Sequence, residues 1–65
     1  MKPRVYAGVD LGGKFHQVQV TNAAGERLGK SFRIGRGKAA LNEMQEGLRR
    51  VAGEDVEVVY TIEAT

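Results

Sequence analysis

The chain of 65 residues is long enough for one small domain and no more. Hydrophobic residues make up 42% and charged residues 28%, which argues against both a disordered segment and a membrane-embedded protein. No apolar run approaches the ~20 residues that cross a bilayer, and no secretion signal opens the chain, so we expect a cytoplasmic location and no membrane partner. The absence of cysteine excludes disulfides and thiolate metal sites. A net charge of +2 permits a nucleic-acid partner without requiring one.

The first two predicted elements are strands joined by a tight turn. Residues 4–11 form a nearly continuous apolar run with Asp10 close to its end, which is typical of a central strand buried on both faces. The sequence Gly12-Gly13-Lys14 predicts a hairpin turn, because paired glycines supply the positive φ that such turns need. Residues 15–21 alternate between apolar and polar positions, which indicates a strand with one face in water.

The second half of the chain predicts an outer strand, a helix and a last strand. Residues 26–34 alternate again and favour a third strand at the edge of a meander. The period then becomes about 3.6 residues, which predicts a helix of about four turns that Gly53 ends. Its apolar stripe consists of Leu41, Met44, Leu48 and Val51. Residues 56–65 form a β-rich run whose apolar side, with Tyr60 and Ile62, is expected to face the helix.

These elements predict one α/β domain with the order strand, strand, strand, helix, strand. A strand that follows a crossover helix usually lies parallel to a strand already in the sheet. The first strand is the natural neighbour, which gives a mixed sheet of order 3-2-1-4. Asp10 and Glu63 then lie on the face away from the helix, at the carboxyl ends of adjacent parallel strands, where ligands collect in open α/β sheets.

The predicted neighbours Asp10 and Glu63 have two interpretations. Paired carboxylates repel each other unless a proton or a cation lies between them, and hard oxygen ligands at strand ends suit Mg²⁺. Two such ions ~3.5–4 Å apart can activate water and stabilise a leaving oxygen in phosphodiester chemistry. The residues alone leave the other interpretation open, in which both are ordinary acids at strand ends in water.

The residue pattern resembles the N-terminal part of the DEDD insertion-sequence transposases. The likeness is carried by residues 5–20, with Asp10 and His16, by the Leu41/Leu48 helix, and by the closing run Thr-Ile-Glu-Ala-Thr at 61–65. These transposases are relatives of the Piv DNA invertases and have a RuvC-like, RNase H-type catalytic domain. The match covers essentially all 65 residues.

The resemblance implies that residues 1–65 are an RNase H-like half-domain from a DNA transposase or site-specific recombinase that uses Mg²⁺. Asp10 corresponds by motif to the family's first catalytic Asp and Glu63 to its Glu, so both would be catalytic residues and metal ligands. It further implies DNA as substrate and a structured guide RNA as partner. Because the family's two later Asp ligands lie beyond Thr65, the chain resembles a truncated domain that is inactive alone.

Two other functions stay open. The actin-like sugar kinases also begin with an Asp-Leu-Gly-Gly hairpin, whose backbone N–H groups wrap a nucleotide phosphate. That loop normally offers a hydroxyl residue directly after the glycines, where this chain has Lys14, and the kinases have no reason to end the fourth strand with Ile62-Glu63. A non-catalytic binding module is the third possibility.

Four further residues are candidates for nucleic-acid binding. Lys14 could contact a substrate phosphate or guide RNA, and Arg36 and Lys38, with Arg33 nearby, could meet a nucleic-acid backbone. His16 fits the family pattern. The alternative is that the cations are merely solvated and that His16 has a structural role.

The predicted sheet is expected to leave apolar surface open. Residues 56–65 would form an unpaired edge strand, and the face with Tyr6 and Val59 would be uncovered. A small core without a disulfide or metal gains stability from association. The sequence therefore predicts a homo-oligomer, either a homodimer or a swapped assembly.

Overall fold

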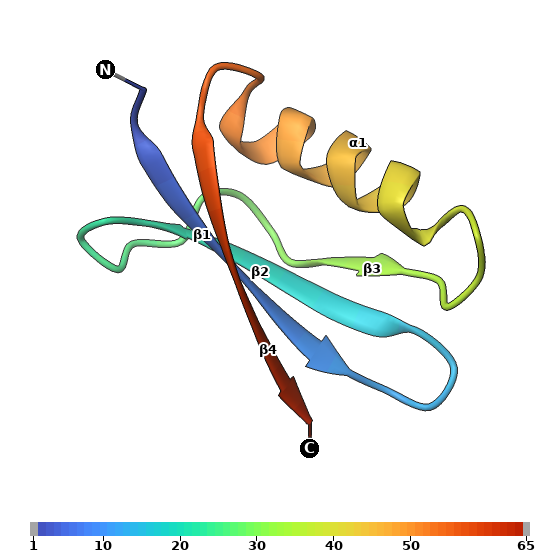
Figure 1. The fold of residues 1–65 in the computed structure, drawn as a ribbon. Helices are drawn as coiled ribbons and strands as arrows, with labels where there is room; N and C mark the ends of the chain where they lie inside the picture. The colour runs from blue at the N-terminus through green and yellow to red at the C-terminus, as the bar shows by residue number, and fades with distance from the viewer. Residues whose placement is uncertain (1, 65) are drawn as a thin grey trace.

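The structure, a computed structural model, describes residues 2–64 and contains one sheet and one helix. The elements in chain order are β1 (Arg4–Leu11), β2 (His16–Asn22), β3 (Phe32–Ile34), α1 (Ala40–Ala52) and β4 (Glu57–Ala64). The four strands form a mixed sheet of order β3-β2-β1-β4, in which β4 runs parallel to β1 and the other pairs are antiparallel (Figure 1). The predicted α/β class, element order and strand order are confirmed.

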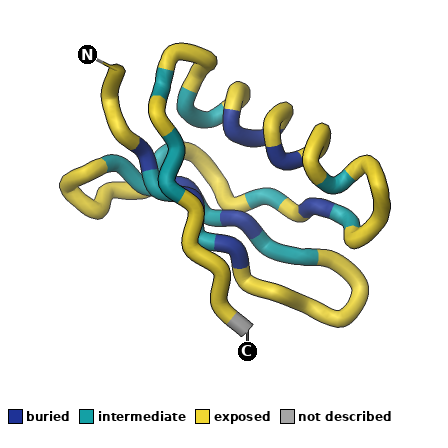
Figure 2. The backbone as a smooth tube through the Cα atoms, in the orientation of Figure 1, coloured by how far each residue is buried: buried dark blue, intermediate teal, exposed yellow. Residues whose placement is uncertain are grey.

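The core lies between one face of the sheet and α1 (Figure 2). Alternation along β1 and β2 sends every second side chain to this face, where small β-branched residues pack under the helix. The buried apolar residues are Val5, Ala7, Val9, Val18, Val20, Ile34, Met44 and Leu48. Gly47 lets the helix approach β3 closely. A Cβ at this position would overlap the ring of Phe32.

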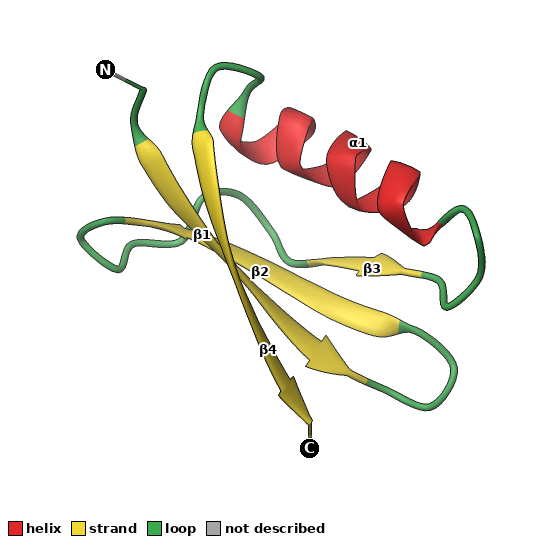
Figure 3. Cartoon of the chain, viewed as in Figure 1, coloured by secondary structure: helices red, strands yellow, loops and turns green. Residues whose placement is uncertain are grey.

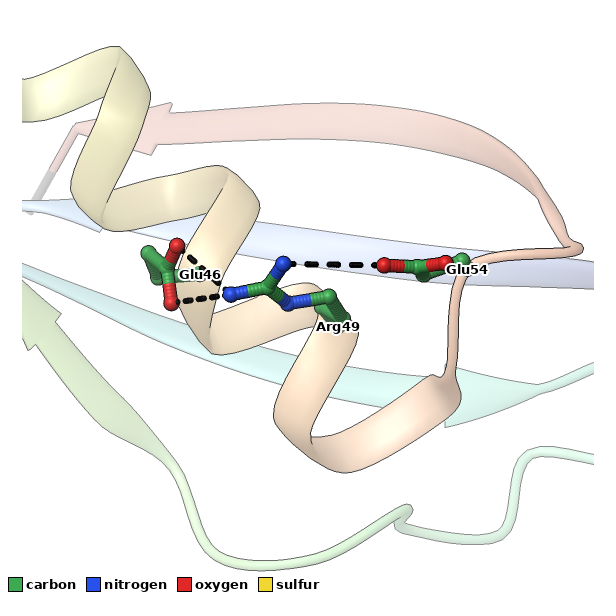
Figure 4. A network of polar contacts seen from close by, with 3 residues as sticks. All are labelled: Glu46, Arg49 and Glu54. Carbon is green, nitrogen blue, oxygen red and sulfur yellow. Dashed lines mark hydrogen bonds and ion pairs between the residues drawn. The ribbon is translucent and has the colours of Figure 1, made fainter.

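The helix ends in an exposed charge network. Gly53, with φ of 84°, donates its N–H to the carbonyl oxygen of Arg49 and ends the helical turn. The Arg49 guanidinium donates to both carboxylate oxygens of Glu46, at 2.7 and 2.6 Å, and lies 3.5 Å from the carboxylate of Glu54 (Figure 4). The hydrogen bond with Glu46 raises the pKa of Arg49 above its ordinary value.

In the described part of the chain, no helix is long and apolar enough to cross a membrane.

The third strand is much shorter than predicted, because β3 covers Phe32–Ile34 and not 26–34. Gly29 adopts a φ of 72°, which interrupts the extended backbone in the middle of the predicted run. Before this bend, the chain makes an isolated bridge between Thr21 and Arg27, and the N–H of Leu28 donates to the carbonyl oxygen of Val20 at 2.8 Å. Residues 26–28 therefore follow β2 only briefly.

The helix covers a different part of the sheet from the one expected. It packs mainly against β2 and β3, and the C-terminal half of β4 lies well apart from it (Figure 1). Tyr60 and Ile62 therefore stay 51% and 67% exposed, and Leu41, predicted to lie in the buried stripe, is 75% exposed. The twist of the sheet accounts for this difference, because each strand is rotated from its neighbour and a short helix cannot follow all four.

Candidate functional site

Asp10 and Glu63 lie side by side at the carboxyl ends of β1 and β4. They are direct partners in the parallel ladder of these strands, and both residues are exposed. Because Val9 is buried in the core, on the sheet face that carries α1, its neighbour Asp10 points to the opposite face, and Glu63, the register partner of Asp10, shares that face. The two carboxylates line a hollow of about 200 Å³, together with Gly8 and Val9. The structure thus brings together the two residues singled out as metal ligands.

Gly8 leaves space in this hollow. It is two residues before Asp10, on the same face, and its register partner is Thr61. A Cβ at position 8 would lie 3.6 Å from the hydroxyl oxygen of Thr61 and 3.8 Å from the carbonyl oxygen of Gln19, which is ordinary contact. Packing of the strands therefore does not require glycine at position 8, and the space that Gly8 leaves open is available to a small ligand.

Within residues 2–64, no ion pair neutralises the charge of the acid pair. The ion pairs in this range are Lys2–Asp55, Arg4–Glu57, Arg49–Glu46 and Arg49–Glu54. Two exposed carboxylates fit part of the shell of Mg²⁺, which commonly takes one or two of them and keeps several waters. No group of three or more His, Cys, Asp or Glu residues that could hold a metal ion occurs in this described range.

His16 has a structural contact at the hairpin. Its Nδ1 atom accepts a hydrogen bond from the backbone N–H of Gly12 at 3.2 Å. His16 is the register partner of the buried Ile34, so it lies on the helix side of the sheet, opposite to Asp10. Neither Gly12 nor Gly13 has the positive φ expected of them, which among residues 2–64 occurs at Gly25, Gly29 and Gly53. Gly12 is required for another reason, since a Cβ there would overlap the carbonyl oxygen of Phe15.

The remaining predicted cations surround the same end of the sheet. Lys14 lies in the β1–β2 hairpin, whereas Arg36 and Lys38 lie in the β3–α1 loop, and Figure 3 shows both loops at the end where β1 finishes. A guanidinium nitrogen of Arg36 donates to the carbonyl oxygen of Gly13, which ties the two loops together. All three cations are exposed, and they lie at the end of the sheet that carries the acid pair.

The structure also reveals a row of side chains that the sequence did not place together. Register pairs Glu63 with Asp10, Asp10 with Gln17, and Gln17 with Arg33, so that one residue from each strand contributes to a line across the open face. We call these four residues the polar row. The Arg33 guanidinium stacks on the ring of Phe15, 4.4 Å from its centroid. Counting residues through the hairpin would have found this row if the register of β2 and β3 had been known.

Comparison with known proteins adds no assignment. No protein family model matches the chain, and neither the curated proteins nor the solved structures contain a match. The resemblance to the transposases stays an interpretation of the residue pattern.

Proposed function

We propose that the chain is an RNase H-like part of a metal-dependent DNA transposase or site-specific recombinase. In this proposal, Asp10 and Glu63 supply two of the acidic ligands for Mg²⁺ in phosphodiester cleavage and strand transfer. The observation that carries the proposal is their direct pairing in the β1–β4 ladder, on the exposed face and without an ion-pair partner among residues 2–64.

The chemistry of the pair supports a metal site. When bound, Mg²⁺ would stabilise negative charge on a phosphoryl oxygen and on the leaving oxygen. Asp10 and Glu63 would hold the ion at the end of two parallel strands, where the backbone fixes their separation. The exposed position leaves room for a long polymeric substrate to reach them, and the cations Lys14, Arg36 and Lys38 lie at the same edge to attract it.

The hairpin favours this proposal over an actin-like sugar kinase. A kinase hairpin of this type binds phosphate through free backbone N–H groups after its Asp. Here the backbone N–H of Gly12 is already donated to Nδ1 of His16. The loop therefore has fewer donors to offer to a nucleotide phosphate.

Magnesium affinity of the 65-residue chain tests the proposal. Asp10→Asn and Glu63→Gln should each weaken Mg²⁺ binding about tenfold or more. Losing a residue that only hydrogen-bonds to a metal ligand already lowers metal affinity by that much, and losing the ligand itself should lower it at least as far. Glu57→Gln is the matched control, because Glu57 lies on the same strand and face but is paired with Arg4 at 2.9 Å. Equal affinities for all three variants, or no measurable Mg²⁺ binding by the parent chain, would contradict the proposal.

A further inference from the structure

The polar row separates opposite charges across the open face of the sheet. Glu63 and Asp10 lie on β4 and β1, and Arg33 lies on β3 at the other edge. Adjacent strands are about 4.8 Å apart, so two strand spacings place Arg33 about 10 Å from Asp10 along the row. The helix of the described residues 2–64, α1, packs on the other side of the sheet and leaves this face uncovered (Figure 3).

Arg33 is held in place without being neutralised. Its guanidinium lies 4.4 Å from the centroid of the Phe15 ring, a stacking contact that leaves the N–H groups at the edge of the guanidinium plane free. Within residues 2–64, no carboxylate forms an ion pair with it. Gln17, the residue between Arg33 and Asp10, donates its side-chain N–H to the hydroxyl oxygen of Ser31 at 2.8 Å. An oriented cation therefore faces solvent on the same surface as the acid pair.

We infer that Arg33 binds a backbone phosphate of the nucleic-acid strand whose reacting phosphate is held at Asp10 and Glu63. This inference rests on the proposed function. A planar guanidinium with several donors suits a phosphate group, and such contacts fix the register of a strand. The separation of about 10 Å, from two strand spacings, is larger than the step between adjacent phosphates of one strand, so a strand with a single phosphate cannot reach both positions. Arg33 is thus a positioning residue, and the strand crosses the sheet from β4 towards β3.

The acid pair makes this binding depend on a cation. Without a metal ion, Asp10 and Glu63 repel a phosphate backbone that lies along the polar row. With Mg²⁺ at the pair, both ends of the row attract phosphate. Strand binding should therefore be stronger with Mg²⁺ than with a chelator, and a strand must be long enough to reach both ends.

A length series of oligothymidylates, titrated by NMR at fixed Mg²⁺, tests the inference. The parent chain should bind four- and eight-nucleotide strands more tightly than a dinucleotide, and Arg33→Ala should remove this gain. The slope of log affinity against log salt should fall by about 0.7 for the eight-nucleotide strand, the value for one lost phosphate contact on a single strand. Arg33→Lys keeps the positive charge but lacks the paired N–H donors of the guanidinium. Its affinity for the eight-nucleotide strand should lie between those of the parent chain and Arg33→Ala.

Arg50→Ala is the matched control. Arg50 is exposed and also lies over an aromatic ring, 5.7 Å from the centroid of Phe32, but it belongs to α1. The Arg50→Ala variant should leave the dependence of affinity on strand length unchanged. Equal losses for the two variants, or no binding of the eight-nucleotide strand by the parent chain, would overturn the inference. If Mg²⁺ binds the acid pair while Arg33→Ala has no effect, the phosphate contact alone fails; if Arg33→Ala changes the salt slope but Mg²⁺ does not bind, the proposed function alone fails.

Discussion

Asp10 and Glu63 are in direct register on adjacent parallel strands, although a hairpin, a third strand and a helix separate them in the sequence. The crossover through α1 brings them together, because it returns β4 parallel to β1 and places both carboxyl ends at one edge. Their shared face follows from the two-residue period of a strand.

The 65-residue chain by itself is expected not to cleave DNA with either Mg²⁺ or Mn²⁺. Phosphodiester chemistry at paired metal ions needs more ligands than two carboxylates, and the described residues 2–64 hold no larger acidic or His group. A plasmid-nicking assay checks this. Cleavage that Asp10→Asn abolishes would show instead that a complete site forms, for example between chains.

Substitutions in the core and at the edge of the sheet should differ sharply in their effect on the free energy of unfolding. Val18 is fully buried, so Val18→Ala should lower the free energy of unfolding by about 2 kcal/mol through lost apolar burial and a small cavity. Ile62 is 67% exposed, and Ile62→Ala should cost under about 0.5 kcal/mol. Urea denaturation measures both. A similar loss at both positions would mean that another surface covers the end of β4.

The contact between His16 and Gly12 should stabilise the hairpin. His16→Ala removes the acceptor for the Gly12 N–H, and the expected loss is about 1 kcal/mol, typical of one hydrogen bond. His16→Asn offers a carbonyl oxygen near the position of Nδ1 and should recover part of it. Hydrogen exchange at the Gly12 amide reports the contact directly. Unchanged exchange in His16→Ala would rule out this role.

We propose that the chain self-associates through β4. Among the described strands, β4 has one neighbour, β1, and residues 58–62 contain no charge, proline or glycine that would protect an edge. The other edge strand, β3, has three residues and carries Arg33. Thr61→Lys should shift the chain to monomer, whereas Asn42→Lys on the exposed surface of α1 should not. Sedimentation at micromolar concentration distinguishes these outcomes, and a monomeric parent chain would contradict the proposal.

Parity and period explain what could be predicted from the sequence. A continuous apolar run identified the strand around Val9, alternation identified the strand around Val18, and the crossover rule placed Glu63 beside Asp10. These patterns act over a few residues or follow a general rule of chain connection. For this reason, the strand order and the acid pair could be derived without coordinates.

The differences arise where the twist of the sheet or a single backbone angle decides the structure. The positive φ of Gly29 shortened the third strand, and nothing in the alternation of residues 26–34 marked that bend. The sheet twist left Leu41 and Ile62 outside the core, because periodicity says which side a residue takes but not how far a helix reaches. The polar row needed the register of β2 with β3, which alternation alone does not fix.

The location of bound Mn²⁺ on the 65-residue chain tests the central claim most directly. Paramagnetic broadening in an NMR titration should begin at the amides around Asp10 and Glu63, including Gly8, and should disappear there in the Asp10→Asn/Glu63→Gln double variant. The exposed Glu46 and Glu54 beside Arg49 provide the internal comparison, because their charge is already paired. Broadening that starts at these helix-end acids, or that survives in the double variant, would contradict a metal site at the ends of β1 and β4.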